Sequence, residues 1–140
     1  MTRIDFYILK DGDVTDPDTV ACKLTEKVYK LGHRVYLHTE SEGQARHMDE
    51  LLWTFRAGSF VPHGLYPGEC DSAPVAIGHA ADPEEHGDVL INLGSEVPAF
   101  FSRFQRVAEV VGGDPAQRDR ARERFRFYRD RGYPLHTHEL

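Results

Sequence analysis

The stretch IDFYILKDGDVTDPDTVACKLTEKVYKLGHRVYLH, residues 4–38, has the pattern of a strand, a helix and a second strand. Its opening segment IDFYIL is largely apolar on both faces, which predicts a strand in the interior of a sheet. Asp16 and Pro17 fit the cap and the first turn of the following helix, and Gly32 fits its end. Apolar residues recur at helical spacing between them: Val20, Leu24, Val28 and Leu31. The segment RVYLH then predicts the second strand.

The rest of the chain continues this alternation of strands and helices. Ser41 and Gln44 form a capping-box pattern at the start of a helix over residues 42–53. Pro115 begins a last helix. Further strands and a short helix are predicted between these two helices, with strands at 74–80, 88–94 and 106–111 and the helix at 98–104. This order predicts an α/β fold, a three-layer α/β/α sandwich with a mostly parallel central sheet of about five strands.

Composition indicates one soluble globular domain over residues 1–140. The chain is 40% hydrophobic and 29% charged, and its length is sufficient to close a single core. No apolar run approaches the roughly 20 residues of a membrane-spanning helix, and the N-terminus lacks the features of a signal peptide. Cys22 and Cys70 are the only cysteines, which favours a reducing cytoplasm over a disulfide framework. We therefore expect a cytoplasmic protein with no membrane contact.

The segment KDGDVTDPD, residues 10–18, follows the predicted first strand, where many α/β proteins bind a phosphate. It contains neither a P-loop nor a glycine-rich dinucleotide motif, and its carboxylates would repel a phosphate group. Its aspartates Asp11, Asp13, Asp16 and Asp18 do not complete a calcium loop, because Cys22 stands where the closing glutamate is needed. We interpret the segment as a solvated turn that ends in a helix cap.

Other candidate catalytic and metal-binding residues are also weak. His136 and His138 lie near the C-terminus with no evident third ligand, so we expect a frayed, solvated tail and no metal site. Ser59 and Ser95 lack the flanking glycines of a nucleophile elbow. The sequence therefore predicts neither an enzyme nor a cofactor-binding protein.

The helix that begins at Pro115 is basic, although the whole chain has a net charge of −6. Its segment carries seven arginines, which are Arg118, Arg120, Arg122, Arg124, Arg126, Arg129 and Arg131. At about 100° per residue, one stripe of the helix combines arginines with an aromatic ring. The stripe contains Arg118, Arg122, Phe125, Arg126 and Arg129. Ala121 and Tyr128 beside it are predicted to face the core, with Phe125 at the boundary.

Three interpretations of this stripe remain open. A ligand that is both acidic and aromatic fits it, because guanidinium groups pair with carboxylates while a ring packs at the edge of the core. Single-stranded nucleic acid is the main rival, since it offers phosphates and stacking bases. The simplest alternative is a solvated amphipathic helix, in which Asp119 and Glu123 balance part of the charge.

A second candidate surface lies in the segment MDELLWTFRAGSFVPHGLYPG, residues 48–68. We expect Leu51, Leu52 and Val61 to lie in the core. Trp53 and Phe60 are too large and too close to a loop for both to be buried. Exposed aromatic residues on irregular segments commonly anchor a protein partner. Contact with such a partner is therefore one interpretation of this segment.

The chain resembles a known family in these segments, the chi subunit of the bacterial DNA polymerase III holoenzyme. The resemblance runs nearly from end to end, through FYIL, MDELLWTF, SFVPHGL, APVAIG, DVLINL and ARERFRFYRDRGYPL. It implies a Rossmann-like fold without a phosphate loop and a clamp-loader accessory subunit without catalytic activity. It also implies two partners. These are the small psi subunit, which links the protein to the clamp loader, and the acidic, phenylalanine-terminated tail of single-stranded DNA-binding protein (SSB).

The resemblance implies an SSB-tail-binding site on Arg118, Arg122, Phe125 and Arg126. Phe125 stands where relatives often carry tyrosine, so a hydrogen bond from that hydroxyl is absent here. Arg118 and Arg126 replace lysines that are common in relatives, which keeps the charge and changes the geometry of the contact.

The psi-binding site falls, by the same resemblance, on Trp53 and Phe60, with Pro62 and His63 shaping the loop. Residues 66–73 and the C-terminal HTHEL match the family poorly and are assigned no role.

Two functions therefore remain in view. One is an adaptor between proteins that contacts DNA only indirectly, and the other is a direct single-stranded nucleic-acid-binding module. The second would need a basic groove that continues over several nucleotides, whereas positive charge outside the last helix is sparse and scattered.

Overall fold

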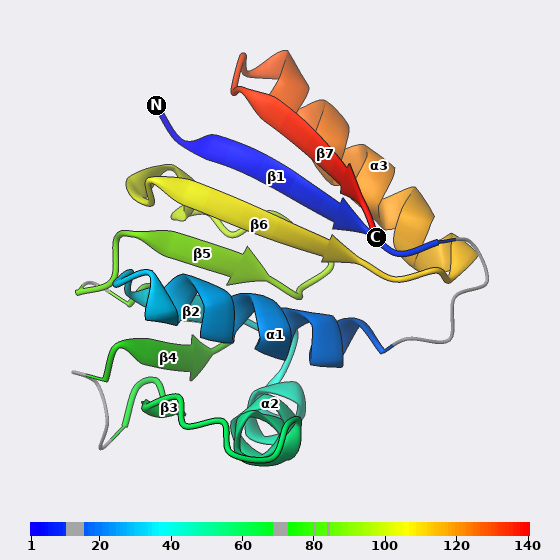
Figure 1. Ribbon diagram of the computed structural model, residues 1–140. Coiled ribbons are helices and arrows are strands. Elements are labelled where there is room, and N and C mark those ends of the chain that lie inside the picture. The colour runs from blue at the N-terminus through cyan, green and yellow to red at the C-terminus, as the bar shows by residue number, and fades with distance from the viewer. Residues whose placement is uncertain (11–15, 69–72, 80, 84) are drawn as a thin grey trace.

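The computed structural model describes residues 1–10, 16–68, 73–79, 81–83 and 85–140. Within them, seven parallel strands form one open sheet in the spatial order β3-β4-β2-β5-β6-β1-β7 (Figure 1). The strands are β1 Arg3–Ile8, β2 Val35–His38, β3 His63–Leu65, β4 Val75–Gly78, β5 Val89–Asn92, β6 Arg106–Val111 and β7 Leu135–Glu139. The helices are α1 Pro17–Lys30, α2 Glu42–Thr54 and α3 Pro115–Asp130, with a 3₁₀ helix η1 at Phe101–Arg103. Among these described helices, none has the length and apolar character to cross a membrane.

The helices form layers on the two faces of the sheet. Helices α1 and α2 lie on one face, where α1 packs on β2, β5 and β6 and α2 packs on β3 and β4 (Figure 1). Helix α3 packs on β6 from the opposite face. The predicted three-layer α/β/α sandwich with a parallel central sheet is therefore confirmed.

Alternate strand residues supply two hydrophobic cores, one on each face. In β2, Val35 and Leu37 pack with α1 and α2, whereas Tyr36 between them packs in the core under α3. In β1, Ile4 and Phe6 also point into the core under α3. Because both faces are covered, the central strands are nearly continuous apolar runs, which is why the sequence revealed them.

The predicted helix starts and stops are confirmed. The Asp16 carboxylate accepts a backbone N–H bond of the first turn of α1, Pro17 is its first residue, and Gly32 follows its end with φ 91°. This left-handed conformation favours glycine. Ser41 Oγ accepts a bond from the Gln44 N–H at 3.2 Å, which caps α2.

The strand count is the main difference from the prediction, because two strands at the edges of the sheet were missed. Strand β3 has only three residues, and it pairs on one side alone, with β4. Strand β7 is polar and pairs on one side alone, with β1. An edge strand needs neither an apolar run nor two covered faces, so periodicity gave no signal for either one.

The expectation of a frayed C-terminal tail is wrong, since His136 and His138 belong to β7. His138 Nε2 lies 2.9 Å from Asp5 Oδ1, and its ring stacks on Tyr7 with centroids 4.7 Å apart. Asp5 is a buried carboxylate in the neighbouring strand. A buried charge needs partners, and the tail supplies one of them.

Some expectations fall on positions outside the described residues, namely Asp11, Asp13 and Cys70. The other cysteine, Cys22, is a free and buried thiol of α1. Burial, together with the charges of Asp18 and Asp16, raises the pKa of the Cys22 thiol to about 12. A thiol that stays protonated is a poor nucleophile and packs as a small apolar side chain.

Candidate partner-binding surfaces

Helix α3 turns one face to the core and another to solvent. Ala121 and Tyr128 are buried, as predicted, in the core that includes β1 and β6. Phe125 is partly buried at the boundary, and Arg118 is partly buried as well. The other arginines of the predicted stripe are exposed, and these are Arg122, Arg126 and Arg129.

A pocket of about 180 Å³ opens between α3 and the end of β1, and we call it the α3–β1 pocket. It is lined by Phe6, Ile8, Val111, Arg118, Ala121, Arg122 and Phe125. Phe6 and Phe125 meet edge to face with ring centroids 5.4 Å apart. The pocket is therefore an apolar hollow with two arginines on its wall. It brings together three of the four residues predicted to bind the SSB tail.

The arginines in and near this pocket differ in the hydrogen bonds that hold their side chains. Arg118 Nη2 donates to the carbonyl oxygen of Leu9 at 2.7 Å, which fixes its guanidinium against the end of β1. Arg122 Nη1 donates to Asp119 Oδ1 at 3.0 Å, but both side chains are largely exposed, so this pair is weak. Arg126 makes no side-chain hydrogen bond within the described part of the chain. Arg122 and Arg126 are thus available to an acidic ligand at little cost.

Arg124 of the same helix has a structural role that the sequence did not reveal. It is only 7% exposed, and its Nε donates to Glu109 Oε1 at 2.9 Å. The second carboxylate oxygen of Glu109 accepts bonds from the Tyr128 hydroxyl at 2.7 Å and from Asn92 Nδ2 at 3.0 Å. This network ties α3 to β5 and β6.

Burial raises the pKa of the Glu109 carboxyl, whereas Arg124, Asn92 and Tyr128 act to lower it. Arginine stays charged in proteins, so a neutral Glu109 would leave a buried guanidinium without its counter-ion. The signal in the sequence was a glutamate inside the apolar strand RVAEVV. Such a residue needs a buried partner, but the pattern alone did not say which one.

The second predicted surface lies at the end of α2. Trp53 is 54% exposed and Phe60 is 81% exposed, which confirms that these rings were too large and too close to the loop to be buried. Leu52 and Val61 are in the core as predicted, and Leu51 is partly buried against it. We call the two exposed rings the Trp53–Phe60 surface.

His63 supports this surface from beneath. It is buried in β3, and its ring nitrogens lie 2.6 Å from the Val61 carbonyl oxygen and 2.9 Å from that of Asp49. The Trp53 ring packs over the fixed imidazole, with centroids 4.3 Å apart. Pro62 is exposed beside it. The Trp53 ring is therefore held in place before any partner arrives, and the role of Pro62 and His63 in binding stays a prediction.

The two surfaces lie at opposite ends of the sheet. The Trp53–Phe60 surface belongs to α2 and to the loop that leads into β3, which is one edge strand. The α3–β1 pocket is lined by residues of β1, β6 and α3, and β1 pairs with the opposite edge strand, β7 (Figure 1). Two protein partners can therefore approach without meeting each other.

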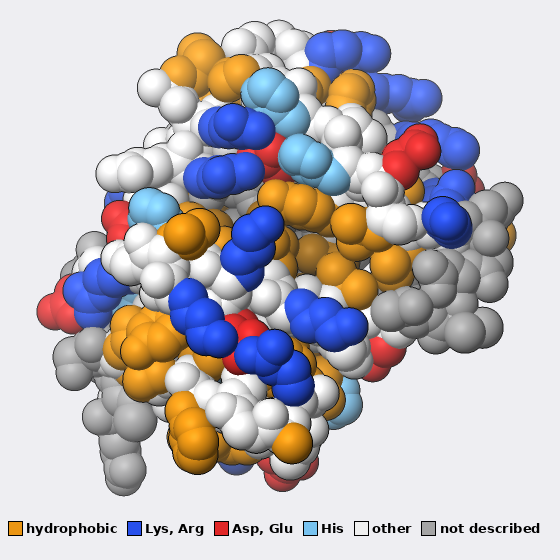
Figure 2. Space-filling view, in the orientation of Figure 1, with side chains coloured by type: hydrophobic (Ala, Val, Ile, Leu, Met, Phe, Trp, Pro, Cys, Tyr) orange, Lys and Arg blue, Asp and Glu red, His pale blue; other side chains and the backbone are white. Residues whose placement is uncertain are grey.

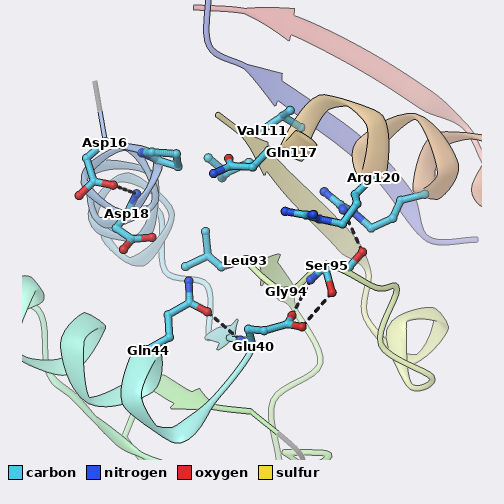
Figure 3. A pocket seen from close by; sticks show the side chains of 13 residues that line it. Asp16, Asp18, Glu40, Gln44, Leu93, Gly94, Ser95, Val111, Gln117 and Arg120 are labelled. Atoms are coloured by element: carbon cyan, nitrogen blue, oxygen red, sulfur yellow. Dashed lines mark hydrogen bonds between the residues drawn. The ribbon is translucent and has the colours of Figure 1, made fainter. Parts of the chain in front are cut away.

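Another hollow, of about 500 Å³, lies beyond the carboxyl ends of the strands (Figure 3). Open α/β sheets commonly bind ligands at this place. Here, however, it is lined by the carboxylates of Asp16, Asp18 and Glu40. The Ser95 backbone N–H and hydroxyl donate to Glu40 at 2.7 and 2.8 Å, and these bonds lower the pKa of Glu40. Arg120 and Arg124 also line the hollow, but the three carboxylates outnumber these two guanidinium groups, which disfavours a phosphate group.

Asp16, Asp18 and His47 each place one potential ligand atom within 4.8 Å of the others. Asp16 is exposed and already caps α1, and Asp18 Oδ2 lies 3.4 Å from His47 Nε2. Exposed carboxylates gather in this way around many helix starts, so the cluster alone is no evidence of a metal site.

Comparison with known proteins gives a consistent result. Residues 1–136 match the family model described as DNA polymerase III chi subunit, HolC. A Pseudomonas aeruginosa protein named DNA polymerase III subunit chi is 47% identical over 140 residues, which cover 100% of this chain and 98% of that protein. Proteins of the same name from Haemophilus influenzae and Escherichia coli are 34% and 33% identical. Those matches cover 96% and 98% of this chain, and 95% and 97% of the two relatives.

Proposed function

Because the chain belongs to the DNA polymerase III chi subunit family, we propose that it is a non-catalytic clamp-loader subunit that joins two other proteins. One partner is the psi subunit, which links this protein to the clamp loader. The other is the acidic C-terminal tail of SSB, so the protein contacts DNA only indirectly. The observation that carries the proposal is the pair of exposed surfaces, different in chemistry, at opposite ends of the sheet.

The α3–β1 pocket supports the proposal for the SSB tail. Its volume of about 180 Å³ is below the roughly 300 Å³ of pockets that enclose whole small molecules, which suits a single inserted side chain. A terminal phenylalanine ring would pack against Phe125, the partly exposed ring of the Phe6–Phe125 pair. Its carboxylate would then pair with Arg122, a charge-assisted contact. Arg126 and Arg129, exposed farther along α3, would attract the acidic residues that precede the ring.

This proposal predicts the binding of a defined peptide. A peptide of several aspartates that ends in Pro-Phe with a free carboxylate should bind with a Kd in the micromolar range, about −8 kcal/mol. Amidating the terminal carboxylate or removing the last phenylalanine should each weaken binding about tenfold or more, because each removes one half of the recognition. Isothermal titration calorimetry measures all three affinities.

A single-stranded oligothymidylate of matched charge is the control ligand for this measurement. The adaptor proposal predicts weaker binding of the oligonucleotide than of the peptide at physiological salt. Tighter binding of the oligonucleotide would favour a direct nucleic-acid-binding module instead, since phosphate contacts alone would then explain the basic helix.

The Trp53–Phe60 surface supports the proposal for psi. Both rings are exposed, and the Trp53 ring packs on the buried His63 imidazole. Large aromatic side chains of this kind contribute most of the binding energy at many protein interfaces.

Trp53→Ala and Phe60→Ala should each weaken the complex with psi by about 2 kcal/mol or more. The free energy of unfolding should change little for Phe60→Ala, because this ring is 81% exposed. Surface plasmon resonance with immobilised psi measures the affinity, and urea unfolding measures the stability. If psi bound both variants as tightly as the unaltered protein, this surface would not be its docking site.

A further inference from the structure

The face of the sheet that carries α1 is covered over only part of its width. Helix α1 packs on β2, β5 and β6, and the described part of the chain places no helix over β1 and β7 on this face (Figure 1). Paired residues of parallel strands point to the same face. The register therefore places Arg3, Asp5 and Tyr7 of β1 beside Arg106 of β6 and His138 of β7.

The charges on this uncovered face leave a cationic surface. The Asp5 carboxylate is fully buried, and it accepts bonds from Arg106 Nε at 2.8 Å and from Arg3 Nε at 3.1 Å. Burial acts to raise the pKa of Asp5, but the bonds from His138, Arg3 and Arg106 lower it on balance. One ionised carboxylate is thus shared by two arginines whose side chains remain partly exposed.

A groove of about 490 Å³ runs between α1 and this cationic surface, and we call it the open-face groove. Its apolar lining comes from α1 and from the sheet, and consists of Leu24, Val28, Leu31, Val89 and Ala108. Leu31, the cap residue after α1, is 67% exposed, and Leu24 and Val28 of the helix are partly exposed. The groove therefore offers apolar area that nothing in the described part of the chain covers.

The rim of the open-face groove is cationic. Arg3, Lys27 and Arg106 line it, against the single carboxylate of Asp88. Asp88 Oδ2 already accepts a bond from the Arg34 backbone N–H at 2.8 Å. Lys27 forms no salt bridge with any described residue. Three cations thus surround an apolar groove on a protein whose net charge is −6.

The excess of cations continues beyond the groove on the same face. In Figure 2, lysine and arginine side chains are spread across the region of α1, and little acidic surface lies among them. Glu26 of α1 is buried beneath Arg56 and Lys30, both of which pair with it. As with Asp5, the anion lies inward and the cations lie outward. Exposed cations therefore outnumber exposed carboxylates over this part of the face, which favours an acidic partner.

We propose that the open-face groove is a third protein-binding site, which takes an acidic segment that inserts an aliphatic side chain. The apolar lining between Val28 and Ala108 receives the inserted side chain, and carboxylates on either side of it pair with Lys27 and Arg106. Electrostatic complementarity of this kind steers association and sets its specificity. The site lies on the opposite face of β1 from the α3–β1 pocket, and it does not depend on the SSB or psi proposals.

The chemistry of the lining favours a peptide over nucleic acid. Bases stack on flat aromatic rings, whereas five of the residues that line this groove are aliphatic and only Tyr7 and His33 carry rings. The Tyr7 ring is already stacked on His138. The side chains of Arg3 and Arg106 are also oriented by Asp5, so few freely moving cations remain to follow a phosphate backbone.

The test uses a short peptide in which aspartates flank two leucines, with its ends acetylated and amidated. Without a free terminal carboxylate it lacks the group that the α3–β1 pocket is proposed to bind. Fluorescence anisotropy of the labelled peptide should show saturable binding to the full-length protein. Lys27→Glu should weaken this binding about tenfold, because it replaces an attraction with a repulsion at the rim. Leu31→Ser should weaken it about threefold through lost apolar contact.

Lys23→Glu is the matched control, since it makes the same charge change on the same helix but outside the groove lining. It should weaken binding less than about threefold at physiological salt, where distant charges are screened. If Lys23→Glu and Lys27→Glu lowered the affinity for the peptide equally, binding would depend on the overall charge of the helix and not on the groove, and the proposal would be overturned. The proposal would also be overturned if an oligothymidylate bound more tightly than the peptide and Lys27→Glu abolished that binding. The groove would then be a nucleic-acid site. Arg122→Glu should leave the blocked peptide unaffected, so the two peptide sites can fail independently.

Discussion

Glu109→Ala should lower the free energy of unfolding by about 3–5 kcal/mol, the largest stability loss that we predict for a single substitution. The substitution leaves the Arg124 guanidinium buried without its counter-ion. It also removes the acceptor of the Tyr128 hydroxyl and of the Asn92 amide, and unsatisfied buried polar groups each cost about 1–3 kcal/mol. Urea unfolding followed by circular dichroism measures the loss.

Two further variants show whether this loss comes from the unpaired charge. Glu123→Ala removes an exposed carboxylate from the same helix and should change stability by less than about 0.5 kcal/mol. The double variant Glu109→Leu with Arg124→Met removes both charges and should recover much of the lost stability. A loss below about 1 kcal/mol for Glu109→Ala would mean that water reaches Arg124 and that the network does not hold α3.

Arg122→Glu should weaken binding of the SSB-tail peptide by about 3 kcal/mol, roughly a hundredfold. It removes a partner for the terminal carboxylate from the wall of the α3–β1 pocket. It also places a negative charge, which repels the carboxylates of the peptide, one helical turn from Arg118 and Arg126. The fold should persist, because Arg122 is exposed and its one ion pair, with Asp119, is a weak surface contact. Isothermal titration calorimetry at physiological salt measures the effect.

Arg120→Glu is the matched control for this substitution. It makes the same charge change at another exposed position of α3. Arg120 lines the hollow beyond the strand ends and not the α3–β1 pocket. Tail affinity should fall less than about threefold in this variant. An undiminished tail affinity in Arg122→Glu, or an equal loss in both variants, would show that the pocket does not recognise the tail.

The sequence predicted the parts of the fold that depend on periodicity. The interior strands are apolar because both faces are covered, and the ends of α1 follow from Asp16, Pro17 and Gly32. Strands β3 and β7 were missed because each pairs on one side only, so neither needs an apolar run. The partner of Asp5 in β7 depends on strand pairing between distant segments, which no local pattern contains.

The candidate site was predictable where residue size and spacing were sufficient. The size of Trp53 and Phe60 and their closeness to a loop predicted that they could not both be buried, and both are exposed. Helical spacing placed Phe125 at the edge of the core. The sequence did not show that Arg124 is buried while the other arginines of the helix lie at the surface. Its burial depends on Glu109, whose position beneath α3 follows only from the order of strands in the sheet.

An adaptor must bind its two partners at the same time. The direct measurement is fluorescence anisotropy of a labelled SSB-tail peptide bound to this protein while psi is added to saturation. We expect the anisotropy of the bound peptide to rise as the complex grows, and the affinity for the peptide to stay within about twofold, because the two surfaces are far apart. Release of the peptide by psi would show that the partners compete for one surface, and would contradict the adaptor.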